Sequence, residues 1–212
     1  MFISICGVEG AGKTTQLRKI ADFLKTTGRD FVITREPGGT EIGMKIRQIL
    51  LDPKNRALTP KAELFLYAAD RTQHIEQLIL PALNEGKIVV TDRFADSTTV
   101  YQGYARGIDL GLVEKINELV LNGLKPDLTI LLDLSPSVGL DRIGNQLQVG
   151  ERTDSESRFE REELVFHEKI REGFLTLARK EKDRFRIIDA DRRPSTVAND
   201  VILVLKKALG IQ

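Results

Sequence analysis

A glycine-rich segment near the start of the chain limits the possible folds more than any other feature. Residues 7–14 read GVEGAGKT, which matches the pattern Gly-x-x-x-x-Gly-Lys-Thr. An apolar run, FISIC, precedes it at residues 2–6, and apolar side chains recur at helical spacing between residues 17 and 24. A strand, a glycine loop and a helix in this order form a phosphate-binding loop, because backbone N–H groups converge on phosphate oxygens at the start of the helix.

The residues of this loop have different roles in the predicted nucleotide site. Lys13 is expected to reach the β- and γ-phosphates of a bound nucleotide, and the hydroxyl of Thr14 is expected to hold Mg²⁺. The alternative is a glycine-rich turn without a ligand, but every fixed position of the pattern is filled. The residues expected to surround the phosphates of the bound nucleotide are Gly7, Val8, Glu9, Gly10, Ala11, Gly12, Lys13, Thr14 and Thr15.

Short apolar runs recur along the chain and predict a parallel sheet. Each has the length of a strand and is apolar enough to be buried on both faces. Longer stretches with helical periodicity separate them, and this alternation predicts an α/β fold with a five-stranded parallel sheet flanked by helices. We expect a single domain over residues 1–212. The predicted strands lie at residues 2–6, 31–34, 88–91, 129–134 and 186–190.

One helix is signalled by its ends. Thr59 is placed to cap it, and Pro60 lies in its first turn. Its apolar positions continue to Leu83, and Pro81 is expected to kink it or end it near Gly86, since proline cannot donate the helical hydrogen bond.

Two more helices are predicted at residues 160–182 and 195–209. The segment 144–158 between helices is polar and has glycine at both Gly144 and Gly150. We interpret residues 143–158 as a short lid, since long polar loops beside phosphate sites often close over them.

The overall charge argues against a nucleic-acid or membrane partner. The 32 basic residues nearly balance the 31 acidic ones, giving a net charge of +1, so any anion site must be a local cluster. The single cysteine, Cys6, excludes an internal disulfide and is expected in the core. No apolar run reaches membrane-spanning length, and the first predicted strand leaves no room for a signal peptide. We therefore expect a cytoplasmic protein.

The predicted strand ends carry charged residues that suit an anion. Ligands of α/β sheets bind beyond the carboxyl ends of the strands. Those ends hold REPGGT at residues 35–40, DRF at residues 92–94, and Asp133. The first two place an arginine beside an acid, so an anion-binding cleft facing the glycine loop is predicted.

Four segments in addition to the glycine loop resemble those of thymidylate kinases. They are TREPGGT (34–40), YAADR (67–71), DRFADSTTVYQG (92–103) and PDLTILLDLSP (126–136). The resemblance covers nearly the whole chain and implies a P-loop kinase fold. It implies an enzyme that transfers the γ-phosphoryl group of ATP to dTMP with Mg²⁺, in dTTP biosynthesis. Family members are homodimers packed through helices, so a homodimer is expected.

The resemblance also implies where dTMP binds. Arg93 and Arg47 would hold the acceptor phosphate, which suits the guanidinium fork. Tyr67 would stack on thymine, and Arg71 would hydrogen-bond the thymine carbonyl. Asp92 would orient Arg93 or a water bound to the metal held by Thr14.

The remaining substrate-binding residues are implied in the same way. Glu9 and Tyr101 would recognise the 3′-hydroxyl group, which gives a reason for a carboxylate inside a phosphate loop. Glu36 is expected at the same site. The edge of the base would be lined by Ser97, Thr98 and Gln102.

The variable positions of the glycine loop contain no arginine. Some family members place a catalytic arginine in this loop and others place it in the lid, and this chain resembles the second, bacterial type. Arg152 and Arg158 are the candidates to neutralise charge on the transferring group, and the sequence RFE at residues 158–160 favours Arg158. Arg142 is expected to stack on adenine.

Other functions remain as alternatives. A deoxynucleoside kinase needs a carboxylate base, for which Glu36 is available, but the two acceptor arginines would then have no phosphate to bind. Another nucleoside monophosphate kinase with a phosphate loop is also compatible. A regulatory GTPase would need an Asn-Lys-x-Asp motif, which does not occur. The two histidines, His74 and His167, lie in predicted helices without evident partners and are interpreted as structural.

Overall fold

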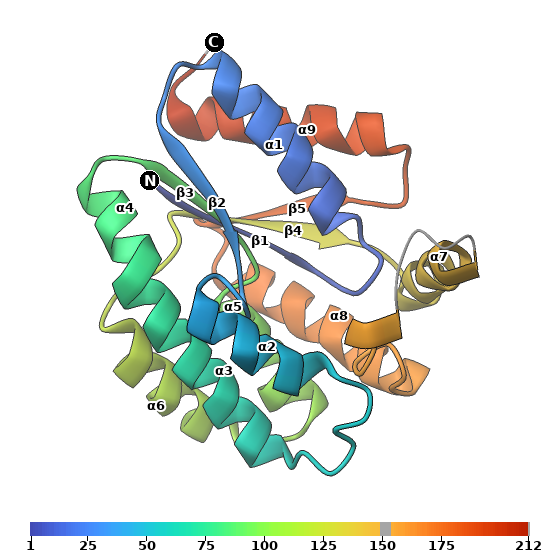
Figure 1. Cartoon of the computed structure of the whole chain (residues 1–212). Coiled ribbons are helices and arrows are strands. Elements are labelled where there is room, and N and C mark those ends of the chain that lie inside the picture. The colour runs from blue at the N-terminus through green and yellow to red at the C-terminus, as the bar shows by residue number, and fades with distance from the viewer. Residues whose placement is uncertain (149–153, 212) are drawn as a thin grey trace.

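The structure is a computed structural model that describes residues 1–148 and 154–211. Its centre is a parallel sheet of five strands in the order β2-β3-β1-β4-β5 (Figure 1). The predicted α/β architecture is therefore confirmed. The strands are β1 (Phe2–Gly7), β2 (Phe31–Arg35), β3 (Ile88–Asp92), β4 (Leu128–Asp133) and β5 (Phe185–Asp189).

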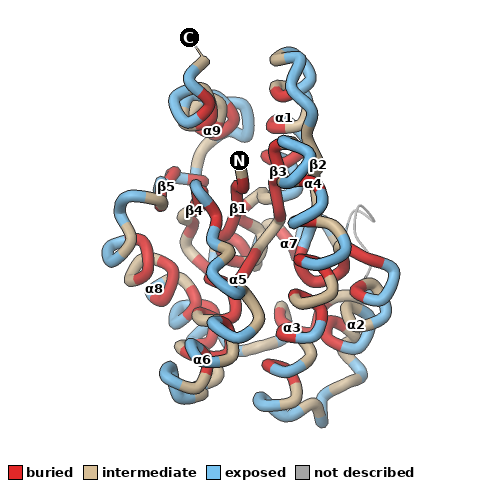
Figure 2. Tube along the Cα trace, turned by 90° about the vertical axis from the view of Figure 1, so that its left-hand side faces the viewer, coloured by how far each residue is buried: buried red, intermediate tan, exposed pale blue. Residues whose placement is uncertain are grey.

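Helices cover both faces of the sheet. Figure 1 shows α1 (Lys13–Thr26) and α9 (Pro194–Leu209) on one side, and α3 (Pro60–His74) and α8 (Leu164–Lys180) on the other. Figure 2 shows that β1, β3 and β4 are buried between these layers. Since β1 turns into the glycine loop at its carboxyl end, the fold places that loop at the edge where ligands of such sheets bind.

Burial on both faces is a wrong prediction for the two edge strands. β2 is only half-buried, and Arg186 and Ile187 of β5 are exposed. An edge strand has a neighbour on one side alone, and the helices cover it less completely.

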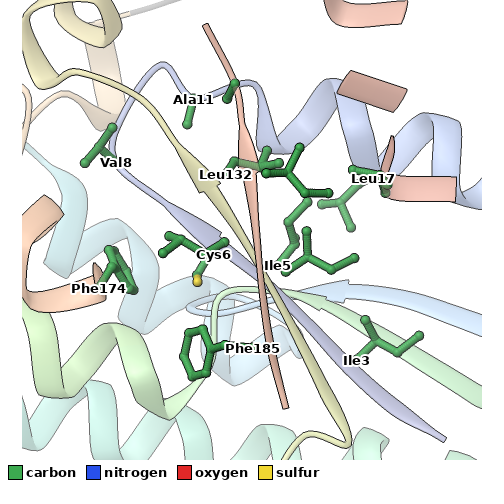
Figure 3. Packing of buried hydrophobic residues seen from close by; sticks show 14 of the residues in the cluster. Ile3, Ile5, Cys6, Val8, Ala11, Leu17, Leu132, Phe174 and Phe185 are labelled. Carbon is green, nitrogen blue, oxygen red and sulfur yellow. The ribbon is translucent and has the colours of Figure 1, made fainter. Parts of the chain in front are cut away.

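The apolar core fills the space between sheet and helices. Along β1, alternate side chains point to opposite faces, and Figure 3 shows Ile5 on the side of Leu17 and Cys6 on the side of Phe174. Cys6 is fully buried, and burial raises the pKa of its thiol, so it serves as a small core residue as predicted.

The proline-containing helix changes geometry where the sequence predicts a kink. Thr59 caps α3, its hydroxyl accepting from the backbone N–H of Ala62. After α3 comes the π-helical turn η1 (Ile75–Ile79) and then α4 (Leu80–Asn84), which contains Pro81. The wider π turn relieves the clash and the missing hydrogen bond that proline causes.

The predicted lid begins later than expected. Helix α7 (Pro136–Gln148) continues through Gly144, where an added β-carbon would meet no other atom. A 3₁₀ turn, η3 (Asp154–Glu156), follows, and α8 begins at Leu164 rather than at residue 160. Residues 149–153 lie outside the described part of the chain.

Three shorter helices and one π-helical segment complete the fold. They are α2 (Glu41–Leu51), α5 (Ala95–Thr98), η2 (Thr99–Ala105) and α6 (Leu110–Leu121). Within the described residues, no helix combines the length and the apolar character needed to cross a bilayer.

Candidate active site

The glycine loop takes a shape that side chains would prevent. Gly12 is the residue before α1 and has φ 87°, and Gly10 has φ 72°. Both values are in the left-handed region that favours glycine. A β-carbon at Gly10 would also collide with the backbone of Gly139 in α7. The loop therefore depends on glycine both for its turn and for its close contact with α7.

Lys13 lies at the centre of this loop. Its Nζ donates to the carbonyl oxygens of Gly7 at 3.1 Å and Val8 at 2.9 Å. Burial and the positive charge of Arg93 lower the pKa of Lys13 to about 8. The ammonium group is thus held where phosphate oxygens would approach, in surroundings that favour an added negative charge.

A cavity of about 620 Å³ lies beside the loop. Its walls come from the loop, the ends of β2 and β3, and the helices α2, α3 and α5 with η2. Residues of α1, α7 and η3 and residues 159–160 complete them. The structure brings every predicted substrate-binding residue into this cavity: Glu9, Glu36, Arg47, Tyr67, Arg71, Arg93, Ser97, Thr98, Tyr101 and Gln102.

The predicted nucleotide and metal residues divide into two groups. The cavity wall includes Gly10, Gly12, Lys13, Thr14, Thr15 and Asp92. Val8 and Ala11 belong to the loop, but their side chains are buried in the core (Figure 3). Arg18 of α1 and Arg35 at the end of β2 line the cavity without having been predicted as ligands.

Arg93 has a strained backbone that aims its side chain. Its φ is 69°, which is uncommon for a residue with a β-carbon. Its N–H donates to the carbonyl of Ile5 at 2.8 Å, and its own carbonyl accepts from the Thr91 hydroxyl at 2.9 Å. These bonds hold the unusual conformation just after β3, and such strain is typical of functional sites.

Two buried atoms at this strand end have no hydrogen-bond partner among the described residues. They are Oδ1 of Asp92 and Nη1 of Arg93. Buried polar atoms are nearly always paired in folded proteins, so unpaired ones in a cavity wall point to a bound ligand. Oδ1 of Asp92 is an acceptor that suits a metal ion or a water bound to it. Nη1 of Arg93 is a cationic donor that suits an anion.

Glu9 is the centre of a buried polar cluster. Its Oε1 accepts from the Tyr101 hydroxyl at 2.5 Å and from Nη2 of Arg93 at 3.0 Å. Its Oε2 lies 3.3 Å from Nδ1 of His167. Burial by itself would raise the pKa of Glu9, but the hydrogen bond with His167 and the charges of Arg93 and Lys13 outweigh it and hold that pKa well below its usual range. Glu9 is therefore a carboxylate fixed at both oxygens.

His167 is a site residue that sequence reasoning missed. It lies in α8 and is buried, and its contact with Glu9 joins residues that are 158 positions apart. No local pattern predicts such a contact. The interpretation of both histidines as lacking partners is thus corrected, since Nε2 of His74 also lies 2.8 Å from the hydroxyl oxygen of Thr34.

Arg71 is held rigidly at the far end of the cavity. Its Nε donates to Oε1 of Glu36 at 2.8 Å, and Nη2 contacts the same oxygen. Nη2 also donates to the hydroxyl of Thr98 at 2.6 Å, and Nη1 donates to Oδ1 of Asn117 at 3.0 Å. Asn117, from α6, was not predicted. Tyr67 precedes Arg71 by one helical turn on α3, and burial raises the pKa of its hydroxyl, so this end of the cavity combines an aromatic ring with fixed polar groups.

The structure describes two of the three arginines that were assigned to the lid region. Arg158 is buried, and its Nη2 donates to Oε2 of Glu63 at 2.5 Å while Nε contacts the carbonyl of Leu50. Its guanidinium is engaged by a buried acid and does not line the cavity. Arg142 donates to the carbonyl of Ala190 at 3.2 Å and is not part of the cavity wall. Arg152 lies outside the described residues.

The chain matches known proteins over nearly its whole length. A family model described as thymidylate kinase matches residues 5–201. The chain is 52% identical over 211 residues to the thymidylate kinase of Desulfosudis oleivorans, covering 100% of this chain and 99% of the relative. It is 53% identical over 211 residues to that of Desulforapulum autotrophicum, with 100% and 93% covered.

A solved structure shows the same relationship. The crystal structure of thymidylate kinase from Ehrlichia chaffeensis superposes with a TM-score of 0.76 at 33% identity, over 97% of this chain and 98% of the other. The sequence matches extend over the glycine loop and the whole cavity described above. The chain belongs to the thymidylate kinase family.

Proposed function

We propose that this enzyme transfers the γ-phosphoryl group of ATP to dTMP. The single observation that carries the proposal is the cavity, which has a phosphate loop at one end and an aromatic ring with fixed polar groups at the other. Arg47 and Arg93 also line the cavity, and Nη2 of Arg93 lies 3.0 Å from Oε1 of Glu9 in the loop. A monophosphate bound with its base near Tyr67 would therefore present its phosphate to the loop that holds the donor.

Mg²⁺ fits the residues at the loop. Thr14 is exposed in the first turn of α1, and Oδ1 of Asp92 is a buried acceptor without a partner among the described residues. The described residues contain no group of three or more His, Cys, Asp or Glu side chains that could hold a metal. This agrees with Mg²⁺, which binds through one or two protein ligands together with phosphates and water. When bound, Mg²⁺ would neutralise charge on the donor phosphates.

The protein residues supply alignment and positive charge. The attacking group is a phosphate oxygen that is already ionised at neutral pH, so no general base is needed. Lys13 would bind the β- and γ-phosphates, and Arg93 would hold the acceptor phosphate, with Asp92 orienting it. Both cations are preorganised: Lys13 by the loop carbonyls and Arg93 by its backbone and by Glu9.

Recognition of the nucleoside follows from the fixed polar groups. Arg71 would donate to the thymine carbonyl, since Glu36, Thr98 and Asn117 already orient its guanidinium. Glu9 would accept from the 3′-hydroxyl group, because His167 and its other partners hold it as a carboxylate. Ser97, whose buried Oγ has no partner among the described residues, would contact the base edge.

The deoxynucleoside kinase alternative is less well supported. It requires a carboxylate free to take a proton from a sugar hydroxyl. Glu36 is the available carboxylate, but its Oε1 is held by Arg71, and only its Oε2 is without a hydrogen-bond partner among the described residues. Because a nucleoside carries no phosphate, Arg47 and Arg93 in the cavity wall would also have no phosphate to bind.

One assay separates the candidate functions. ATP consumption would be measured with dTMP, dUMP, other mononucleotides, and thymidine as the nucleoside control. We expect dTMP to support turnover and thymidine to be inert, because the acceptor oxygen belongs to the phosphate. Turnover with thymidine would instead identify a nucleoside kinase.

Substitution of Arg93 tests the assignment of the acceptor end. Arg93→Ala is expected to raise the KM for dTMP and to lower kcat by roughly a hundredfold or more, because it removes a preorganised charge at the reacting phosphate. The Kd for ATP should change little. Arg29→Ala, an exposed arginine at the opposite end of the sheet, is the control and should behave as wild type. Loss of ATP binding alone in Arg93→Ala would place this residue at the donor end.

The lowered pKa of Lys13 predicts how ATP binding depends on pH. ATP favours the charged lysine, so binding raises this pKa from its value of about 8 in the free enzyme. Affinity should be highest below pH 8 and should weaken above it, by at most about tenfold per pH unit. The phosphates are already ionised in this range. Calorimetric titration between pH 7 and 10 would measure the effect, and Lys13→Ala should show no such dependence; an equal dependence in that variant would refute the explanation.

We also propose a single domain over residues 1–212, a homodimer and a cytoplasmic location. The homodimer is supported by exposed apolar side chains on neighbouring helices. Ile42 of α2 is 50% exposed, Phe65 of α3 is 59% exposed and Leu119 of α6 is 83% exposed. Exposed apolar side chains of this kind are common at subunit interfaces. Sedimentation equilibrium would measure the oligomeric state directly.

A further inference from the structure

Arg47, one of the two arginines predicted to bind the acceptor phosphate, is already bound by an acid of this chain. Nε of Arg47 donates to Oε1 of Glu156 at 2.9 Å, and Nη2 donates to Oε2 at 2.6 Å. Nη1 of Arg47 donates to the carbonyl of Pro37 at 2.9 Å. Arg47 and Glu156 both line the cavity, with 16% and 41% of their side chains exposed. The Nε–Nη2 edge of the guanidinium therefore carries a bidentate carboxylate.

The position of Glu156 is set by the surrounding fold. Glu156 ends η3, and two residues later the backbone N–H of Arg158 donates to the carbonyl of Leu51 at 3.2 Å. The buried side chain of Arg158 is fixed to Glu63 at 2.5 Å. Leu51 and Arg47 belong to the same helix, α2. The segment that carries Glu156 is thus attached to the helix that carries its partner.

A carboxylate and a phosphate make the same contact with a guanidinium. Each offers two oxygens as acceptors to two parallel N–H groups, and one edge of a guanidinium can bind only one such anion at a time. A phosphate that used the Nε–Nη2 edge of Arg47 would have to displace Glu156. The displaced carboxylate would also remain in the same cavity, where its charge would repel the phosphate.

We propose that Glu156 competes with the acceptor phosphate for Arg47 and thereby sets the affinity for the phosphate group of the acceptor. This inference rests on the proposed role of Arg47 in binding that phosphate. It makes Glu156 a specificity-determining residue, since the competition affects ligands with a phosphate and leaves the uncharged nucleoside unaffected. Binding of dTMP would then require exchange of one anion for another on Arg47.

The test compares binding of dTMP and thymidine without ATP, by isothermal titration calorimetry. In Glu156→Gln, the affinity for dTMP should rise by roughly three- to tenfold, the range that corresponds to a partly exposed ion pair and its repulsion. The affinity for thymidine should stay the same. Glu156→Ala, which cannot hydrogen-bond Arg47, should give at least as large a rise. Thermal unfolding of each variant would verify that it is folded.

A matched control removes the same charge elsewhere. Glu85 is exposed, pairs with Lys87 and lies just before β3, at the opposite end of the strand from Arg93. Glu85→Gln should leave both affinities unchanged. An equal rise in this control would attribute the effect to net charge and overturn the proposal.

Variants of Arg47 distinguish failure of the inference from failure of the site assignment. Arg47→Ala should lower the affinity for dTMP and leave the affinity for thymidine unchanged. If neither affinity falls, Arg47 does not bind the phosphate, and both the site assignment and the competition by Glu156 are wrong. If Arg47→Ala weakens dTMP but Glu156→Gln leaves its affinity unchanged or lowers it, the site assignment stands and the competition is wrong. In the double variant, the gain from Glu156→Gln should fall to less than half, because the contested arginine is absent.

Discussion

Replacing Lys13 with alanine is expected to lower kcat for phosphoryl transfer by at least about a thousandfold. The ammonium group lies on the carbonyls of Gly7 and Val8, at the point where the loop and α1 meet. It would bind the phosphate oxygens on which charge develops during transfer, and loss of one preorganised charge at such a position typically has an effect of this size.

The fold should tolerate this substitution. Burial and Arg93 already disfavour the charged form of Lys13 in the free enzyme. The substitution removes two hydrogen bonds, but it also removes the repulsion between this ammonium group and Arg93. The melting temperature should change little. Lys19→Ala, an exposed lysine on the same helix, is the control and should keep wild-type turnover. A Lys13→Ala enzyme with near-normal turnover of dTMP would contradict the phosphate-loop assignment.

Arg158 is expected to act on stability rather than on the chemical step. Its guanidinium pairs with Glu63, a carboxylate that is 1% exposed. Removing one member of a buried pair leaves the other charge without compensation and costs several kcal/mol. Arg106 and Gln102 also contact Glu63, so they reduce the loss of stability. We therefore expect Arg158→Ala to lower the free energy of unfolding by about 3 kcal/mol.

Single-turnover kinetics separate this role from that of a catalytic arginine. At saturating substrates, Arg158→Ala should keep the rate constant of the chemical step within about tenfold of wild type. Arg152 stays the candidate for the transferring group, and Arg152→Ala should slow that step by roughly a thousandfold without loss of stability. Arg142→Ala completes the set, and its chemical step should stay within the same tenfold range. If Arg158→Ala slows the step a thousandfold in a protein of wild-type stability, Arg158 must leave Glu63 during the reaction.

Local sequence patterns were sufficient to predict the fold class and the phosphate loop. The glycine loop requires a strand before it and a helix after it, so GVEGAGKT and its flanking residues predict β1 and α1. Proline has a local effect on the backbone, and Pro81 accordingly lies just after a π-helical turn. The parallel arrangement also follows, because helices separate successive strands and return each to the same direction.

Local patterns were less successful at element ends and in side-chain partners. Gly144 suggested a loop, yet α7 continues through it, since a glycine inside a helix reduces its stability by only about 1 kcal/mol. Arg158 lies in a segment, RFE, that resembles a catalytic lid exit, but the buried Glu63 on α3 attracts its guanidinium.

The sequence by itself determined which residue types are available at the site: a phosphate loop, strand ends with arginines, and an aromatic ring followed by arginine on one helix. Only the tertiary structure decided which of these groups meet. Glu9 meets His167 across 158 positions and Arg47 meets Glu156 across 109. Periodicity reports the face on which a side chain lies, whereas a contact between distant side chains depends on how the elements pack together. The partners of Arg47, Arg158 and Glu9 were therefore decided by how η3, α3 and α8 pack against the rest of the chain.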